Sequence, residues 1–168
     1  MYWSPKEVYY TKQNKHNRRE LGMPQFAPEH FQGKRRREQG CWPYALNSKY
    51  WKFALVGEFI GKVQKKDATD EELIEAVIEE GKYFGLKIRR VNMNYTPEKD
   101  KEYLIYLRRK TSNGNYTFFR QDTSGFWSYK AKGEKPKQLR SFNDVANGIN
   151  NEKEGTYVGF LFVVKEDR

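Results

Sequence analysis

The sequence of 168 residues contains a single cysteine, Cys41, and only two histidines, His16 and His30. One cysteine cannot form an internal disulfide, and without a cluster of cysteine and histidine there is no zinc-binding pattern, so we expect neither a metal nor a cofactor. No apolar run approaches the roughly 20 residues that a membrane-spanning helix needs. The first ten residues, MYWSPKEVYY, also lack the apolar core of a signal peptide, so we expect a cytoplasmic or virion-associated protein.

Negative charge is the scarcer sign, since 32 Lys and Arg stand against 22 Asp and Glu, and the formal net charge is +10. Such a charge permits attraction to nucleic acid, to an anionic membrane surface or to an acidic protein, and it selects none of them. Aromatic residues make up 16% of the chain, so large rings can fill a core despite the modest hydrophobic content. We therefore expect one folded domain rather than a disordered chain.

Residues 1–40 show no sustained helical or strand period, and proline and glycine interrupt them repeatedly. This segment carries two basic groups, Arg18 with Arg19 and the run Lys34, Arg35, Arg36 and Arg37. We predict an extended basic and aromatic arm over residues 1–40, followed by a folded domain over residues 41–168. Adjacent cations near aromatic rings suit contacts with the phosphates of nucleic acid, and a solvated charged run is the alternative.

Two helices are predicted at the start of the domain. The first begins at Cys41 or Trp42, has Pro43 in its first turn, and continues without a breaker to Gly57. The second begins at the capping-box sequence Thr69-Asp70-Glu71-Glu72, which precedes apolar residues at three- and four-residue spacing and a stop at Gly85.

Strands dominate the remainder of the chain. Alternation and β-forming residues predict strands at 86–93, 103–109, 116–121, 126–130 and 157–165, with a hairpin turn at Asn113-Gly114 and a short helix at 141–147. The expected fold class is therefore α+β, with N-terminal helices packed on a largely antiparallel sheet.

The stretch GCWPYALN places Cys41 at the start of the first predicted helix. A helix N-terminus favours the thiolate, and an imidazole on a neighbouring strand would complete a pair of nucleophile and base. The alternative for a lone cysteine is a small buried hydrophobic residue. Trp42, next to this cysteine, is a candidate for lining a groove.

A resemblance supports the catalytic alternative in part. The stretch above is similar to an N-C-Y-x-Y-A-L-N motif, and residues 115–130, NYTFFRQDTSGFWSYK, are similar to D-Y-H-x-Y-R-Q-D-x-x-G-x-W-S-H-K. Both motifs occur in small bacterial and phage proteins that resemble papain-like cysteine peptidases or amidases. The resemblance implies a papain-like fold with Cys41 as nucleophile. Thr117 and Tyr129 replace the two histidines of the motif, and neither residue is a base near neutral pH.

We therefore predict a non-catalytic papain-like domain, a pseudoenzyme, that acts as a viral or phage binding or structural protein through its basic arm. Its expected partner is a protein or virion subunit, or nucleic acid bound by the arm. One alternative is an active cysteine peptidase or amidase in which His30 or a residue of a partner acts as the base. Another is a nucleic-acid-binding protein that does not discriminate sequence.

Overall fold

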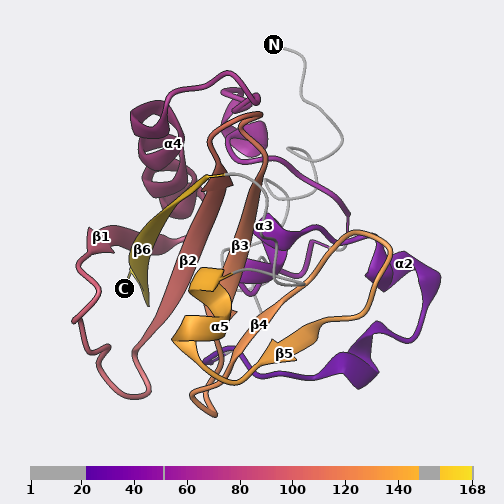
Figure 1. Cartoon of the computed structure of the whole chain (residues 1–168). Helices are drawn as coiled ribbons and strands as arrows, with labels where there is room; N and C mark the ends of the chain where they lie inside the picture. Colours follow the sequence, from indigo (N-terminus) through magenta and orange to yellow (C-terminus); the bar gives the residue numbers. More distant parts are fainter. Residues whose placement is uncertain (1–21, 51, 148–155, 168) are drawn as a thin grey trace.

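The computed structural model describes residues 22–50, 52–147 and 156–167, and a six-stranded antiparallel sheet lies at its centre (Figure 1). The strands are β1 (Leu86–Val91), β2 (Glu102–Lys110), β3 (Tyr116–Gln121), β4 (Trp127–Tyr129), β5 (Lys137–Leu139) and β6 (Tyr157–Glu166). They lie in the order β1-β6-β2-β3-β4-β5, so the last strand of the chain pairs with both β1 and β2 inside the sheet. The predicted α+β class and antiparallel sheet are confirmed.

Helices cover both faces of the sheet (Figure 1). They are η2 (Pro28–Phe31), α2 (Lys34–Arg37), α3 (Cys41–Ala45), η3 (Glu58–Ile60), α4 (Asp70–Tyr83) and α5 (Phe142–Asn147). On one face, α3 and α4 bury a cluster that includes Trp42, Val77 and Phe118. On the other face, α5 covers a second cluster that includes Phe119 and Val145. Consecutive residues of β3 therefore face opposite layers, as the pleat of a strand requires.

The predicted capping box begins α4. The side chain of Thr69 accepts a hydrogen bond from Glu72 N at 3.1 Å, and Glu72 Oε1 accepts one from Thr69 N at 3.0 Å. Gly85, with φ 76°, follows the end of the helix, where the left-handed conformation favours glycine. With 14 residues α4 is short for a bilayer, and none of the described helices is long and apolar enough to cross a membrane.

The first predicted helix is much shorter than expected, because α3 ends at Ala45 rather than near Gly57. Asn47 adopts φ 55°, a left-handed conformation that cannot continue a right-handed helix. Gln39 Nε2 then donates to the carbonyl oxygens of Ser48 and Tyr50 at 3.0 and 2.9 Å. These hydrogen bonds hold the following segment in a non-helical path.

The segment that precedes α3 packs on the domain, which corrects the expected extended arm for residues 22–40. It contains η2 and α2, and Thr123 N donates to the carbonyl oxygen of Pro24 at 2.9 Å. The buried ring of Phe31 lies edge-on to Tyr44 with the ring centroids 6.1 Å apart. Residues 24–31 are therefore in contact with the rest of the fold through these groups. Arg18, Arg19 and His16 lie outside the described residues.

Candidate functional site

Cys41 is the first residue of α3, as the sequence predicted, with Gly40 as the N-cap. The residue is half-buried and packs against the hydrophobic cluster beneath α3 and α4. Burial raises the pKa of its thiol, and this effect exceeds the opposing effects of nearby backbone N–H groups and of the Lys130 charge. The group is therefore a protonated thiol near neutral pH.

Thr117 and Tyr129 lie on the face of the sheet that is remote from Cys41. Phe118 packs in the cluster under α3, whereas Thr117, one residue earlier in β3, lines a hollow with Phe119. Tyr129 packs on Phe119 in the cluster under α5, with the ring centroids 5.5 Å apart. A histidine at either motif position would therefore be separated from Cys41 by the thickness of the sheet.

His30, the candidate base, does not share a pocket with Cys41 in the described structure. It lies in η2, exposed, beside a pocket that is also lined by Asn47 and Arg120 and not by Cys41. Within residues 22–50, 52–147 and 156–167, no imidazole hydrogen-bonds to the sulfur. The groups that act on the thiol are Lys130 and the backbone N–H groups of Cys41, Trp42 and Phe118.

Trp42 does not line a groove, contrary to expectation, because its side chain is 1% exposed. Its Nε1 donates to Glu80 Oε1 at 2.5 Å, and the same oxygen accepts from Gly57 N at 2.9 Å. Glu80 Oε2 accepts from Phe59 N at 3.0 Å. Glu80 is fully buried and joins α4 to α3 and to the start of η3. Sequence reasoning missed this role, because Glu80 stands in a helix rich in acidic residues, where no local pattern distinguishes it.

Burial raises the pKa of Glu80 to about 7 from its ordinary value of 4.5. Between these values the folded protein holds a proton that the unfolded chain has lost, so the free energy of unfolding should fall as pH rises. Deprotonation of Glu80 should lower the free energy of unfolding by about 3 kcal/mol, and this loss is complete above the pKa of Glu80 in the folded state. Urea denaturation from pH 4.5 to 8 should show this slope in the wild type and not in Glu80→Gln. Equal slopes in both proteins would contradict the assignment.

A buried polar network connects β3 and β4 to α3. Arg120 Nε donates to Asp122 Oδ1 at 2.7 Å, and Ser128 Oγ donates to Asp122 Oδ2 at 2.6 Å. Because the hydroxyl hydrogen of Ser128 is used in this way, the hydroxyl of Tyr44, 2.8 Å from Ser128 Oγ, is the donor of that pair. Burial raises the pKa of Tyr44 to about 12, which keeps its proton in place. The Arg120 guanidinium also lies 3.7 Å from the centroid of the Tyr44 ring.

The network accounts for many of the residues that carry the sequence resemblance. Tyr44 and Asn47 come from the first motif, and Arg120, Asp122 and Ser128 come from the second. Arg120 Nη1 donates to the carbonyl oxygen of Tyr44 at 2.9 Å and to Asn47 Oδ1 at 3.4 Å. These residues hold α3 against the sheet.

Lys130 fixes the N-terminal segment to the end of β4. Its side chain is fully buried, and Nζ donates to the carbonyl oxygens of Arg37 at 2.6 Å, Gln39 at 2.7 Å and Ala131 at 3.0 Å. Burial lowers the pKa of Lys130 to about 8. Gly133 N also donates to the carbonyl oxygen of Arg37, at 2.5 Å. The loop after β4 is therefore held directly against α2.

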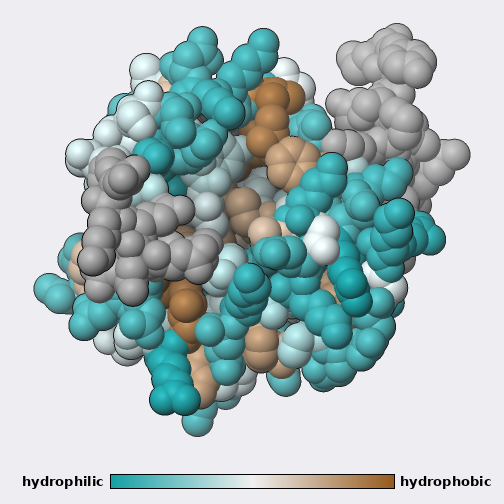
Figure 2. Space-filling model, turned by 45° about the vertical axis from the view of Figure 1, so that its right-hand side comes forward, coloured by the Kyte–Doolittle hydropathy of each residue, from teal (hydrophilic) through white to brown (hydrophobic). Residues whose placement is uncertain are grey.

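This contact creates a basic surface, which we define as Lys34, Arg35, Arg36, Lys132 and Lys135; all five are exposed. Arg37 is not part of it, because its side chain is half-buried and its guanidinium donates to the carbonyl oxygens of Phe31 and Gln32. The ring of Phe53 is 43% exposed and lies 5.6 Å from Lys132 Nζ. Figure 2 turns the α2 side of the molecule forward and shows a largely hydrophilic face with smaller hydrophobic areas between.

Comparisons with protein-family models, with curated proteins and with solved structures find no significant match to this chain. Within the described ranges, no group of three His, Cys, Asp or Glu side chains is placed to hold a metal ion.

Proposed function

We propose that the protein is a non-catalytic binding domain that holds single-stranded nucleic acid by its phosphate backbone on the basic surface. The observation that carries this proposal is the meeting of two basic segments that are distant in sequence. Lys34 and Arg35 lie on α2, and Lys132 and Lys135 lie in the loop that Gly133 and Lys130 attach to α2. Clustered cations on one surface bind phosphates by releasing condensed counterions.

The chemistry around Cys41 supports a non-catalytic role. Its thiol is protonated near neutral pH, and Thr117 and Tyr129 face the opposite layer of the sheet. The papain-like layout stays a hypothesis: a cysteine at the first position of a helix that packs on an antiparallel sheet supports it. Because Thr117 and Tyr129 lie on the face of the sheet opposite Cys41, their positions argue against the loss of histidines that once paired with this thiol.

Backbone binding fits this surface better than the reading of a base sequence in duplex DNA. The helix α2 has only four residues, too few to present a recognition face in a major groove. The exposed ring of Phe53 beside Lys132 offers a platform on which a base can stack. Basic side chains around an aromatic ring are typical of proteins that bind single strands without sequence preference.

The double variant Lys34→Gln/Arg35→Gln should bind a single-stranded oligonucleotide about tenfold more weakly at low salt, because two phosphate contacts are lost. The slope of log K against log salt should decrease by about 1.4, at about 0.7 for each contact with a single strand. Lys132→Gln/Lys135→Gln should have a similar effect if both segments form one surface. Fluorescence anisotropy over a range of salt concentrations measures affinity and slope together.

Lys82→Gln/Lys87→Gln is the matched control, since it removes the same charge from exposed positions on α4 and β1, at the other end of the molecule in Figure 1. This control should change the affinity by less than about twofold and leave the slope nearly intact. An affinity that does not depend on salt, or equal losses in all three variants, would overturn the proposal.

A further inference from the structure

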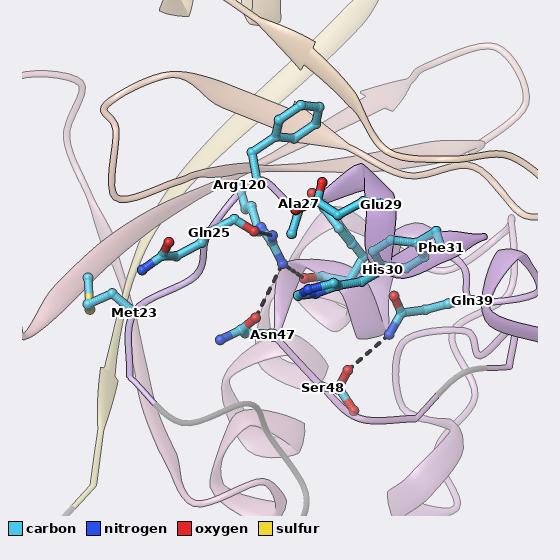
Figure 3. A pocket seen from close by; sticks show the side chains of 12 residues that line it. Met23, Gln25, Ala27, Glu29, His30, Phe31, Gln39, Asn47, Ser48 and Arg120 are labelled. Atoms are coloured by element: carbon cyan, nitrogen blue, oxygen red, sulfur yellow. Dashed lines mark hydrogen bonds between the residues drawn. The ribbon is translucent and has the colours of Figure 1, made fainter. Parts of the chain in front are cut away.

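A pocket of about 350 Å³ lies between residues 23–31 and the end of α3 (Figure 3). Rings of Phe26, His30 and Tyr44 contribute to its walls. It adjoins the basic surface, because α2 follows η2 closely and Arg36 Nη1 donates to the carbonyl oxygen of His30 at 3.1 Å. A ligand held on the basic surface can therefore extend into this pocket.

One polar group of the pocket lacks the partner that its burial demands. Asn47 is 7% exposed, and its amide nitrogen Nδ2 is buried without a hydrogen-bond partner. Its amide oxygen accepts from Arg120 Nη1 at 3.4 Å, which sets the orientation of the amide. Figure 3 shows the nitrogen directed away from Arg120. A buried donor without a partner is rare in folded proteins, and an acceptor oxygen placed against it would satisfy it.

The charges in the pocket define the chemistry of that acceptor. Arg120 lines the pocket, but its charge is matched by Asp122 at 2.7 Å. Its guanidinium also donates to the carbonyl oxygens of Tyr44 and Gln25. The pocket therefore offers no uncompensated arginine to a phosphate, and Glu29 on its rim disfavours an anion. A neutral planar group with a carbonyl oxygen satisfies Asn47 Nδ2 and packs on the surrounding rings.

We propose that this pocket receives the base of one unstacked nucleotide, whose carbonyl oxygen accepts a hydrogen bond from Asn47 Nδ2. The inference rests on the proposed function, because the phosphates on either side of that nucleotide lie on the basic surface. The base stacks against the rings of the pocket, as unpaired bases do in proteins that bind single strands. The basic surface thus binds the phosphates, and the pocket binds one base.

The test compares two oligomers of about ten nucleotides, one of thymidine and one with the same sugar-phosphate backbone without bases. Fluorescence anisotropy should show the thymidine oligomer binding about tenfold more tightly to the wild-type protein. Asn47→Asp keeps an oxygen for Arg120 and a residue that tolerates the left-handed conformation, but it removes the donor. This variant should lower the ratio of the two affinities about threefold, because stacking on Phe53 and on the rings of the pocket remains.

Gln32→Glu is the control for the charge that Asn47→Asp adds, because Gln32 is exposed and does not line the pocket. It should weaken both oligomers equally and keep the ratio. His30→Ala removes an exposed ring of the pocket and should lower the ratio even if Asn47→Asp fails to fold, which circular dichroism would reveal.

The outcomes separate the two proposals. Equal affinity of the wild-type protein for both oligomers overturns the base pocket and leaves backbone binding intact. If Asn47→Asp and His30→Ala both keep the wild-type ratio of affinities for the two oligomers, the base binds elsewhere, and this result also overturns the base pocket. Failure to bind either oligomer overturns the proposed function itself.

Discussion

Replacing Glu80 by alanine is expected to lower the free energy of unfolding by about 4 kcal/mol. The carboxylate accepts hydrogen bonds from Trp42 Nε1, Gly57 N and Phe59 N, and all of these donors lie in the interior beneath α4. Alanine leaves them without an acceptor, and each unpaired buried donor is costly. Because domains of this size are stable by only about 5–15 kcal/mol, the loss is a large fraction of the total. Urea denaturation followed by circular dichroism measures it.

Glu79→Ala is the matched control, one residue earlier in the same helix. Glu79 is exposed and pairs with Lys62 at 3.3 Å, so its removal should change stability by no more than about 0.5 kcal/mol. Glu80→Gln should fall between the two, near 2 kcal/mol, because its oxygen still accepts while its NH₂ group meets the N–H of Phe59. Similar losses in Glu79→Ala and Glu80→Ala would show that helix propensity, and not the buried acceptor, determines stability here.

Local sequence signals predicted the elements whose structure depends on nearest neighbours. The capping box at Thr69 and Glu72 began α4, and the Asn113-Gly114 turn joined β2 to β3 with Gly114 at φ 75°. The strand over residues 116–121 was predicted with its observed bounds. Each of these features follows from spacing of apolar residues or from the backbone preference of one residue, and both are visible in a short window of sequence.

Features that depend on distant contacts were missed. The predicted helix after Cys41 ended early because Gln39 holds the carbonyl oxygens of Ser48 and Tyr50, a contact that no periodicity reveals. The short β5 was absent from the prediction, since only its pairing with β4 makes it a strand. Residues 22–40 were interpreted as an arm because their fixed position comes from contacts such as Lys130 with Arg37, far away in the sequence.

In the candidate site, too, local features were predicted and those that depend on distant contacts were missed. The sequence placed Cys41 at a helix start, and the structure confirms that position. It did not show that the motif residues of β3 divide between two faces, with Arg120 directed to α3 and Thr117 to the opposite layer. A strand alternates with period two, so the faces of all its side chains follow once one of them is known. The sequence motif alone did not indicate which face carries α3.

Asp122→Ala is the second change with a large expected effect, a loss of about 4 kcal/mol in the free energy of unfolding. Asp122 is 3% exposed and compensates the buried guanidinium of Arg120. Its removal leaves a buried positive charge without a counterion and takes the acceptor away from Ser128 Oγ. Glu134→Ala removes an exposed carboxylate that pairs with Lys137 at 3.8 Å, and it should cost no more than about 0.5 kcal/mol.

The double variant Arg120→Leu/Asp122→Ala distinguishes a charge effect from a loss of packing. If the uncompensated charge dominates, removing Arg120 as well should recover about 1–3 kcal/mol relative to the sum of the two single variants. Full recovery is not expected, because Arg120 also donates to the carbonyl oxygens of Tyr44 and Gln25, which leucine leaves unpaired. Strictly additive losses would mean that the two side chains stabilise the fold independently, and the network would then not act as one unit between α3 and the sheet.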